Sequence, residues 1–241
     1  MKPAALFGLL AALAMPAFAD PGYYVVTPYD REGIASAELR YWTVKPDDDI
    51  ETTWPEVAFS YGVNSRWTTL LLASYIGSTS EATKPSLLTW QNVVLLTQGE
   101  LPVDIALYGA VSRLLGSRPG HSYEYGPVLQ TEFGRTQVNL NALFERVRRS
   151  GSWGPLRLKY QWQLRQHSRS WLQPGLQGFG ELGDWDHWSG HSQQSNRAGP
   201  AVFATLPPGG QHALQVQAAY LAGRTYGDSG RMFSLRVLLP F

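Results

Sequence analysis

The chain has 241 residues, of which 44% are hydrophobic and 12% aromatic, and it carries 20 Lys and Arg against 19 Asp and Glu. This near-neutral balance does not indicate nucleic acid or another polyanion as a partner. The sequence contains no cysteine, so its fold must be stabilised without disulfide bonds. Mean hydropathy is slightly negative, and no segment beyond residue 19 is long and apolar enough to predict a membrane-spanning helix.

The N-terminus has the three parts of an export signal. Lys2 supplies a positive charge, residues 4–15 form an apolar run, and residues 17–19 (Ala-Phe-Ala) have the small-x-small pattern of a signal-peptidase site. The apolar run is too short for a spanning helix, which needs about 20 residues. We therefore predict a signal peptide over residues 1–19. Its removal, which takes Lys2 with it, would leave 19 basic and 19 acidic residues.

Most of the remaining sequence alternates between apolar and polar residues, as β-strands with two different surroundings do. In the clearest case, residues 156–165, the apolar face carries Leu158, Tyr160 and Trp162, and the other face carries cations and amides. A Lys or Arg placed against lipid at mid-bilayer destabilises a barrel by ~2–4 kcal/mol. The polar faces must therefore point away from lipid, whereas the apolar faces can meet it.

Segments of this kind predict an all-β fold, a single antiparallel transmembrane β-barrel of about 12 strands. With an even number of strands, both ends of the chain would lie on the periplasmic side. The periplasmic turns are then expected to be short and the outer loops longer. The predicted strands are residues 35–42, 55–63, 67–76, 86–97, 103–111, 123–133, 138–145, 156–165, 176–182, 198–206, 214–220 and 232–241.

The predicted barrel occupies residues 34–241. Residues 20–33 precede it and are expected to form a short N-terminal periplasmic arm at the mouth of the barrel. We expect neither a second domain nor a plug segment, because no stretch of sequence between the predicted strands is long enough to form one.

The closing segment, residues 232–241, alternates strictly and ends on the aromatic carboxyl terminus Phe241. In this it resembles bacterial outer-membrane β-barrel proteins, whose last strand typically ends in Phe after apolar residues at alternate positions. The resemblance implies a place in the outer membrane of a Gram-negative bacterium. It also implies outer-membrane lipids and the barrel-assembly machinery as partners, the latter through Phe241.

Residues 61–67, Tyr-Gly-Val-Asn-Ser-Arg-Trp, resemble a Tyr-Gly-Val/Leu-Thr-Asp-Arg-Trp/Leu turn found in exported barrels, notably in the meta-pathway of phenol degradation family. Members of that family look like outer-membrane barrels that assist the uptake of hydrophobic or aromatic compounds. The likeness is confined to this turn and the general layout, and it departs at Asn64 and Ser65. No site residue of the family is carried over.

Charged residues on the polar faces are expected to line the lumen. The acidic ones lie mostly on early and middle strands and the basic ones on late strands or across the closure, which predicts separate acidic and basic arcs. Such a lumen would orient a dipolar or anionic solute. Alternatively, the same charges pair across the lumen and leave no path. The predicted lumen-lining residues are Arg40, Asp104, Glu124, Glu132, Glu145, Arg157, Lys159, Arg165 and Arg236.

A long polar loop over residues 183–195 is densest in residues capable of chemistry. Its acidic and histidine side chains could bind a metal ion or a polar solute, and its tryptophans could stack on a sugar or aromatic ring. Alternatively, the charges serve solvation and the tryptophans lie at the membrane interface. The spacing matches no fixed metal site, so we predict no metal and no cofactor. The outer-loop candidates are Asp184, Trp185, Asp186, His187, Trp188 and His191.

A lipid-modifying enzyme would need a nucleophile within hydrogen-bond reach of its base. His191 and Ser192 are adjacent in sequence, so they would point to opposite faces of any strand, and no enzyme is predicted. The sequence favours an outer-membrane channel or passive transporter for small solutes, with hydrophobic or aromatic compounds suggested by the resemblance. A non-conducting structural or surface-recognition barrel is the second hypothesis, and an outer-membrane lipid-modifying enzyme the third.

Overall fold

The computed structural model describes residues 23–29, 32–47, 49–168, 171–206, 212–225 and 227–241. The predicted signal peptide and its cleavage site lie outside these residues. Within the described part of the chain, no helix has the length and apolar character needed to cross a membrane.

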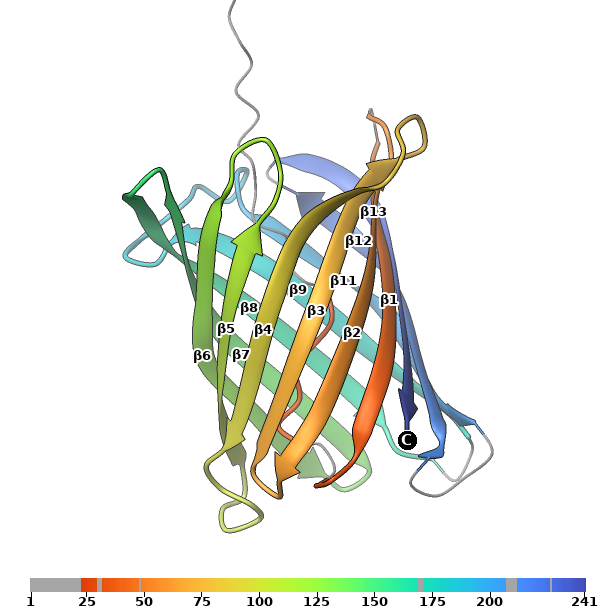
Figure 1. Ribbon diagram of the computed structural model, residues 1–241. Coiled ribbons are helices and arrows are strands. Elements are labelled where there is room, and N and C mark those ends of the chain that lie inside the picture. Colours follow the sequence, from red (N-terminus) through yellow and green to blue (C-terminus); the bar gives the residue numbers. More distant parts are fainter. Residues whose placement is uncertain (1–22, 30–31, 48, 169–170, 207–211, 226) are drawn as a thin grey trace, which may run out of the picture.

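The described strands form one antiparallel sheet of 13 strands that closes on itself (Figure 1). The first strand pairs with the last, and the two middle strands β8 and β9 complete the ring. The two-residue β10 pairs with β9 alone, so twelve strands build the wall. The strands are β1 (Ala35–Pro46), β2 (Thr52–Asn64), β3 (Trp67–Ser78), β4 (Lys84–Leu95), β5 (Asp104–Leu114), β6 (Gly120–Phe133), β7 (Thr136–Arg149), β8 (Ser152–Gln166), β9 (Leu172–Asp184), β10 (His187–Trp188), β11 (Ser195–Leu206), β12 (Leu214–Thr225) and β13 (Asp228–Pro240).

The two ends of the wall meet at one rim, where the amide of Phe241 donates to the carbonyl of Ala35 at 2.8 Å. This end is termed the C-terminal rim and the other the distal rim. The tight turns at residues 134–135 and 150–151 use Gly134 and Gly151, whose φ angles of 61° and 83° favour glycine. One of these turns lies at each rim, and longer links also occur at both. The predicted loop over 183–195 is at the distal rim and is shortened by β10.

The outer surface of the wall is apolar. Leu39 and Leu71 are 59% and 61% exposed, which suits contact with hydrocarbon rather than with water. On the inner face, Asn139 and Gln177 are fully buried. The predicted orientation, with apolar faces outward and polar faces inward, is therefore confirmed.

Two glycines of β9 make room for aromatic rings on the outer face. A Cβ at Gly178 would lie 2.2 Å from Nε1 of Trp162, and one at Gly180 would lie 2.2 Å from the ring of Tyr160. The two rings belong to residues of β8, which are the cross-strand partners of these glycines. They therefore cover the part of β9 that has no side chains of its own, a pairing that stabilises glycine-containing sheets.

Residues 23–29 run inside the barrel from its distal half to the C-terminal rim (Figure 1). Tyr23 and Val25 pack near Trp42, and Val26 packs near Leu143. This differs from the expected arm at the periplasmic mouth and from the expected absence of a plug segment. The physical reason is that a short apolar run gains stability by covering inward-facing apolar side chains that water would otherwise contact.

Candidate functional site: the barrel lumen

Three charged side chains from neighbouring strands form an ion-pair group in the lumen, termed the Lys159 cluster. Nζ of Lys159 on β8 lies 3.0 Å from Glu124 on β6 and 2.8 Å from Glu145 on β7. Ser122 donates a hydrogen bond of 2.6 Å to Glu145. Lys159 and Glu145 are almost fully buried, so these charges stabilise the fold only as long as they stay paired.

A second group, the seam cluster, joins the first and last strands. Arg40 on β1 lies directly opposite Arg236 on β13, an arrangement in which two like charges would repel. The carboxylate of Glu38 offsets this repulsion: it accepts from Nε of Arg40 and, at 2.5 and 3.1 Å, from Nε and Nη2 of Arg236. The guanidinium carbon of Arg40 also lies 3.3 Å from the centre of the Tyr24 ring.

Five of the nine predicted lumen residues thus lie in two cross-paired groups, rather than in one acidic and one basic arc: Glu124, Glu145 and Lys159 in the first, and Arg40 and Arg236 in the second. Sequence reasoning missed Glu38, which is central to the seam cluster. The available signal was its position two residues before Arg40, on the same strand face. Of the predicted residues, Arg40, Glu145 and Lys159 are buried, Asp104, Glu124, Arg157, Arg165 and Arg236 are partly buried, and Glu132 is exposed.

Side chains of the wall hold the N-terminal segment 23–29. The amide of Val26 donates to Gln161 at 3.1 Å, and its carbonyl accepts from Asn141 at 2.9 Å. The hydroxyl of Tyr24 donates to Gln91 at 2.9 Å. Buried backbone groups need such partners, so the inward amides of the wall stabilise the segment at its centre.

The end of the segment nearest the C-terminal rim is held by Asp104, the first residue of β5. The hydroxyl of Tyr29 donates to the Asp104 carboxylate, which also accepts from the amide of Gly99 at 2.7 Å. Partial desolvation and the neighbouring carboxylate raise the pKa of Tyr29 to about 12. The phenol therefore stays neutral and remains a donor throughout the physiological pH range.

Aromatic rings pack closely in the distal half of the lumen. The ring of Tyr23 meets Trp42 edge-on at 4.7 Å and Phe179 at 5.5 Å between ring centres. Trp42 in turn stacks on Trp54 at 4.0 Å. Each such contact contributes ~0.5–1.5 kcal/mol beyond the burial of area. The distal end of the segment is therefore firmly packed.

Cavities in the lumen differ in size between the two halves. In the distal half, a cavity of about 50 Å³ lies beside Glu124 and Glu145, and one of about 10 Å³ lies beside Tyr23 and Lys159. Towards the C-terminal rim, two cavities of about 220 and 270 Å³ both reach Thr27 and Arg236. The space that could admit a solute therefore lies mainly in the half next to the C-terminal rim.

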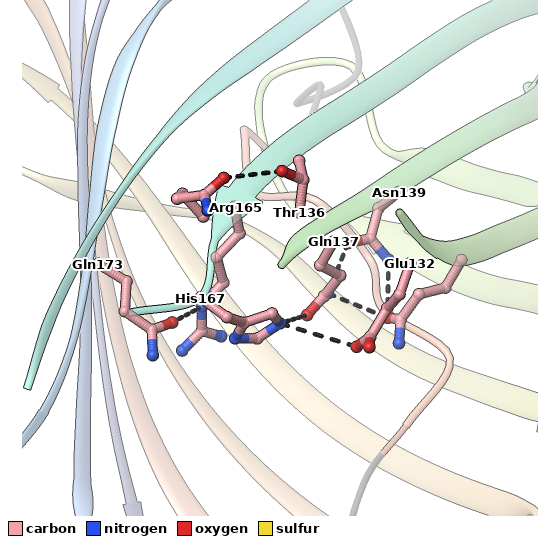
Figure 2. Close-up of polar contacts among 9 residues, drawn as sticks. Glu132, Thr136, Gln137, Asn139, Arg165, His167 and Gln173 are labelled. Carbon is pink, nitrogen blue, oxygen red and sulfur yellow. Dashed lines mark hydrogen bonds and ion pairs between the residues drawn. The ribbon is translucent and has the colours of Figure 1, made fainter. Parts of the chain in front are cut away.

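A polar network lies at the C-terminal rim, beside the cavity of about 220 Å³ (Figure 2). Nε2 of His167 lies 3.2 Å from Gln137 and 3.7 Å from Glu132. On the other side of His167, Nε of Arg165 donates to Gln173 at 2.6 Å. The His167 contacts reach β6 and β7, and the separate bond between Arg165 and Gln173 joins β8 and β9.

The predicted outer-loop residues lie in and just after a short hairpin at the distal rim. Asp184 ends β9 and pairs with His187 of β10 in a short hairpin. Trp185 lies 6.5 Å from the ring of Phe144 on β7, and both Trp185 and Trp188 are exposed, as interfacial tryptophans are. Among the described residues, no group of three His, Asp or Glu could hold a metal ion. His191 and its neighbour Ser192 lie in a turn and not on a strand.

A closed β-wall with an apolar exterior and a polar, charged interior defines a transmembrane β-barrel, because closure leaves no strand edge unpaired in lipid. The chain has the fold of bacterial outer-membrane barrel proteins, in agreement with the predicted location.

Comparison with one solved structure supports this fold, and a second structure shows a weaker likeness. Over 93% of this chain and 100% of the other, the fold is similar to the COG4313 outer membrane channel from Pseudomonas putida F1, with 13% identity and a TM-score of 0.63. OpdK from Pseudomonas aeruginosa, solved with vanillate, matches 88% of this chain and 66% of its own, with 13% identity and a TM-score of 0.43. The sequence itself matches no family model and no curated protein.

Proposed function

We propose that the protein is a passive channel for small solutes in the bacterial outer membrane. The observation that carries this proposal is the pair of cavities, of about 220 and 270 Å³, on either side of Thr27 and Tyr29. Amide and hydroxyl groups contribute to the linings of both, so a solute with polar groups would find hydrogen-bond partners there.

A complete path requires residues 23–29 to shift, because the cavities of the distal half are only about 50 and 10 Å³ in volume. The contacts at the centre of the segment permit such a shift. Val26 is held by the side-chain amides of Gln161 and Asn141, so its release would break no hydrogen bond between wall strands. Movement of this segment would therefore change the width of the lumen while the barrel stays closed.

The nature of the lining also bears on the solute. The resemblance of residues 61–67 suggests hydrophobic or aromatic compounds, but charged and amide side chains surround the larger cavities. We therefore propose solutes that combine an apolar body with a polar group. We also propose that the barrel-assembly machinery recognises Phe241, whose side chain is accessible because it is 56% exposed.

A non-conducting barrel with a structural or surface-recognition role is the second candidate. It is favoured by the packed distal half, where the Lys159 cluster and the aromatic contacts of Tyr23 leave little space. In that case the segment would be a fixed part of the interior, and the exposed Trp185 and Trp188 at the distal rim would be candidates for contact with a partner.

Conductance and flux measurements on the mature protein separate the two candidates. In planar bilayers we expect stepwise current increases, and in liposomes we expect uptake of small solutes. Heat-denatured protein in the same detergent is the matched control. If neither current nor uptake exceeds this control, in the wild type and in a variant with a displaced segment, the barrel does not conduct and the second candidate holds.

A further inference from the structure

Arg165 differs from three other inward-facing cations that lie near the N-terminal segment. Lys159, Arg40 and Arg236 each contact a carboxylate, whereas Arg165 forms no ion pair with any residue that the structure describes. Its Nε is fixed by the hydrogen bond to Gln173 at 2.6 Å. The terminal Nη groups, which present paired donors that match a carboxylate, are left for another acceptor.

The cavity that Arg165 lines is electropositive. Arg165 and Arg236 are the charged members of its described lining, which includes no Asp or Glu. Arg236 shares the carboxylate of Glu38 with Arg40, whereas Arg165 has no carboxylate partner among the described residues. The rest of the polar lining is rich in amides, which can accept or donate hydrogen bonds: Gln130, Gln137, Gln163, Gln215 and Gln217.

An apolar surface lies next to this cation. The ring centre of Phe203 is 5.0 Å from the guanidinium carbon of Arg165. The ring covers Gly175, where a Cβ would come within 2.7 Å of it, so the absence of a side chain at Gly175 lets the ring lie there. Leu238 adds a further apolar group to the cavity wall. The cavity therefore offers a positive charge and an apolar surface side by side.

We propose that this cavity binds a small organic carboxylate. The carboxylate pairs with the Nη groups of Arg165, and the apolar or aromatic body of the molecule lies against Phe203. The inference deepens the proposed channel function and rests on it, since it names the class of solute and a place where the solute stops on its way. The volume of about 220 Å³ can accommodate a molecule of roughly benzoate's size.

Benzoate binding to the detergent-solubilised mature protein, measured by titration calorimetry, tests the site without any need for conductance. Arg165→Gln should weaken binding roughly 10- to 100-fold, the loss expected when a charge-assisted contact disappears. Arg157→Gln is the matched control, because Arg157 occupies the same inward face of β8 but does not line the cavity. It should bind benzoate as the wild type does.

Further variants and ligands examine the chemistry. Arg165→Lys keeps the charge but not the paired donors and should retain part of the affinity, which also shows that the position tolerates change. Phe203→Leu should weaken benzoate more than acetate. Benzyl alcohol, which has the ring but no charge, should not displace benzoate, and neither should inorganic phosphate.

Two results would overturn the site: equal benzoate affinity in the wild type and Arg165→Gln, or phosphate binding as tight as that of benzoate. The outcomes also separate the site from the channel. Conductance without benzoate binding would disprove the carboxylate site and leave the channel. Benzoate binding that is lost in Arg165→Gln, in a protein that carries no current, would support the site and disprove the channel.

Discussion

The two halves of the lumen are built from the same alternating strands, yet they differ in how they use their polar side chains. In the distal half, Lys159 is paired with Glu124 and Glu145, and rings pack around Tyr23. In the half next to the C-terminal rim, Arg165 has no carboxylate partner among the described residues, and the cavities are larger. Ion pairs also occur beside the larger cavities, in the seam cluster, so the close packing of rings around Tyr23 is what distinguishes the filled half.

The comparison also shows that the strand pattern alone does not determine whether a lumen is open. Twelve wall strands enclose a space that side chains can fill or leave partly empty. Here the segment 23–29 takes part in both outcomes, since Tyr23 belongs to the packed half and Tyr29 lies beside the larger cavities. The variants below test whether the two halves behave as differently as their contacts indicate.

The largest effect is expected in the distal half, for Lys159→Met. Removal of this ammonium would leave Glu124 and Glu145 in the interior without their cation, and breaking a buried ion pair costs about 3–5 kcal/mol of unfolding free energy. Urea unfolding in lipid vesicles, followed by tryptophan fluorescence, measures the loss. The triple variant that adds Glu124→Gln and Glu145→Gln removes the charges together and should recover much of it. An unchanged unfolding midpoint in Lys159→Met would contradict the pairing.

A smaller effect is expected for Val25→Asp, which places an unpaired carboxylate where the wild-type side chain is 1% exposed. Docking of the segment should weaken by roughly 3 kcal/mol, about a 100-fold shift towards the displaced state. The backbone of Val26 is bonded to side chains of the wall and not to its strand backbones. The barrel should therefore stay folded when the segment is displaced, while its conductance rises. Thr27→Val is the control, since it alters the same segment without adding a charge beside the larger cavities. Equal conductance in Val25→Asp and the wild type would show that the segment does not obstruct the lumen.

Arg165→Glu examines the half next to the C-terminal rim. Replacing its uncompensated cation by a carboxylate should shift ion preference from anions towards cations, because a charge in a narrow lumen sets the local ion concentration. The reversal potential in a KCl gradient reports this preference. Arg157→Glu changes the same charge on the same strand face outside the cavity and should shift the potential less. A larger shift for Arg157→Glu would place the selective region in the distal half.

The smallest effect is expected for Tyr24→Phe. The substitution keeps the ring beneath Arg40 but removes the hydroxyl that donates to Gln91. One hydrogen bond contributes about 0.5–1.5 kcal/mol, and the loss is measured as a shift in the urea midpoint. In a double-mutant cycle with Gln91→Leu, the coupling free energy between the two positions should equal the loss of unfolding free energy in Tyr24→Phe. Independent effects of the two substitutions would mean that the bond adds nothing to stability.

Alternation predicted the wall well, because lipid on one side and a polar interior on the other impose a two-residue period on every strand. The prediction for residues 156–165 lies within β8 (Ser152–Gln166). The predicted strand at residues 176–182 is shorter than the observed β9 (Leu172–Asp184). Several residues of this strand are glycines, which have no side chain to show the alternation. The two-residue β10 was not predicted, as it depends on a local hairpin.

The interior was predicted only in part. Glu145 and Lys159 lie on consecutive inward faces, so the sequence brings them to neighbouring strands. The path of residues 23–29 could not be derived in this way, because its contacts join distant parts of the chain. Asn141, for example, holds the carbonyl of Val26 across a separation of 115 positions. Seven residues of irregular backbone have no periodicity that indicates a location inside the barrel.

The contact between Glu38 and Arg236 spans 198 positions and exists only when the first strand meets the last. A slip of one residue between these strands would turn Arg236 towards the acyl chains, where a cation costs a barrel ~2–4 kcal/mol at mid-depth. A barrel that closes with β1 and β13 in the wrong register would therefore lose this ion pair and also expose Arg236 to lipid. The charges at the seam thus favour the correct alignment of the first and last strands over one that is shifted by a residue.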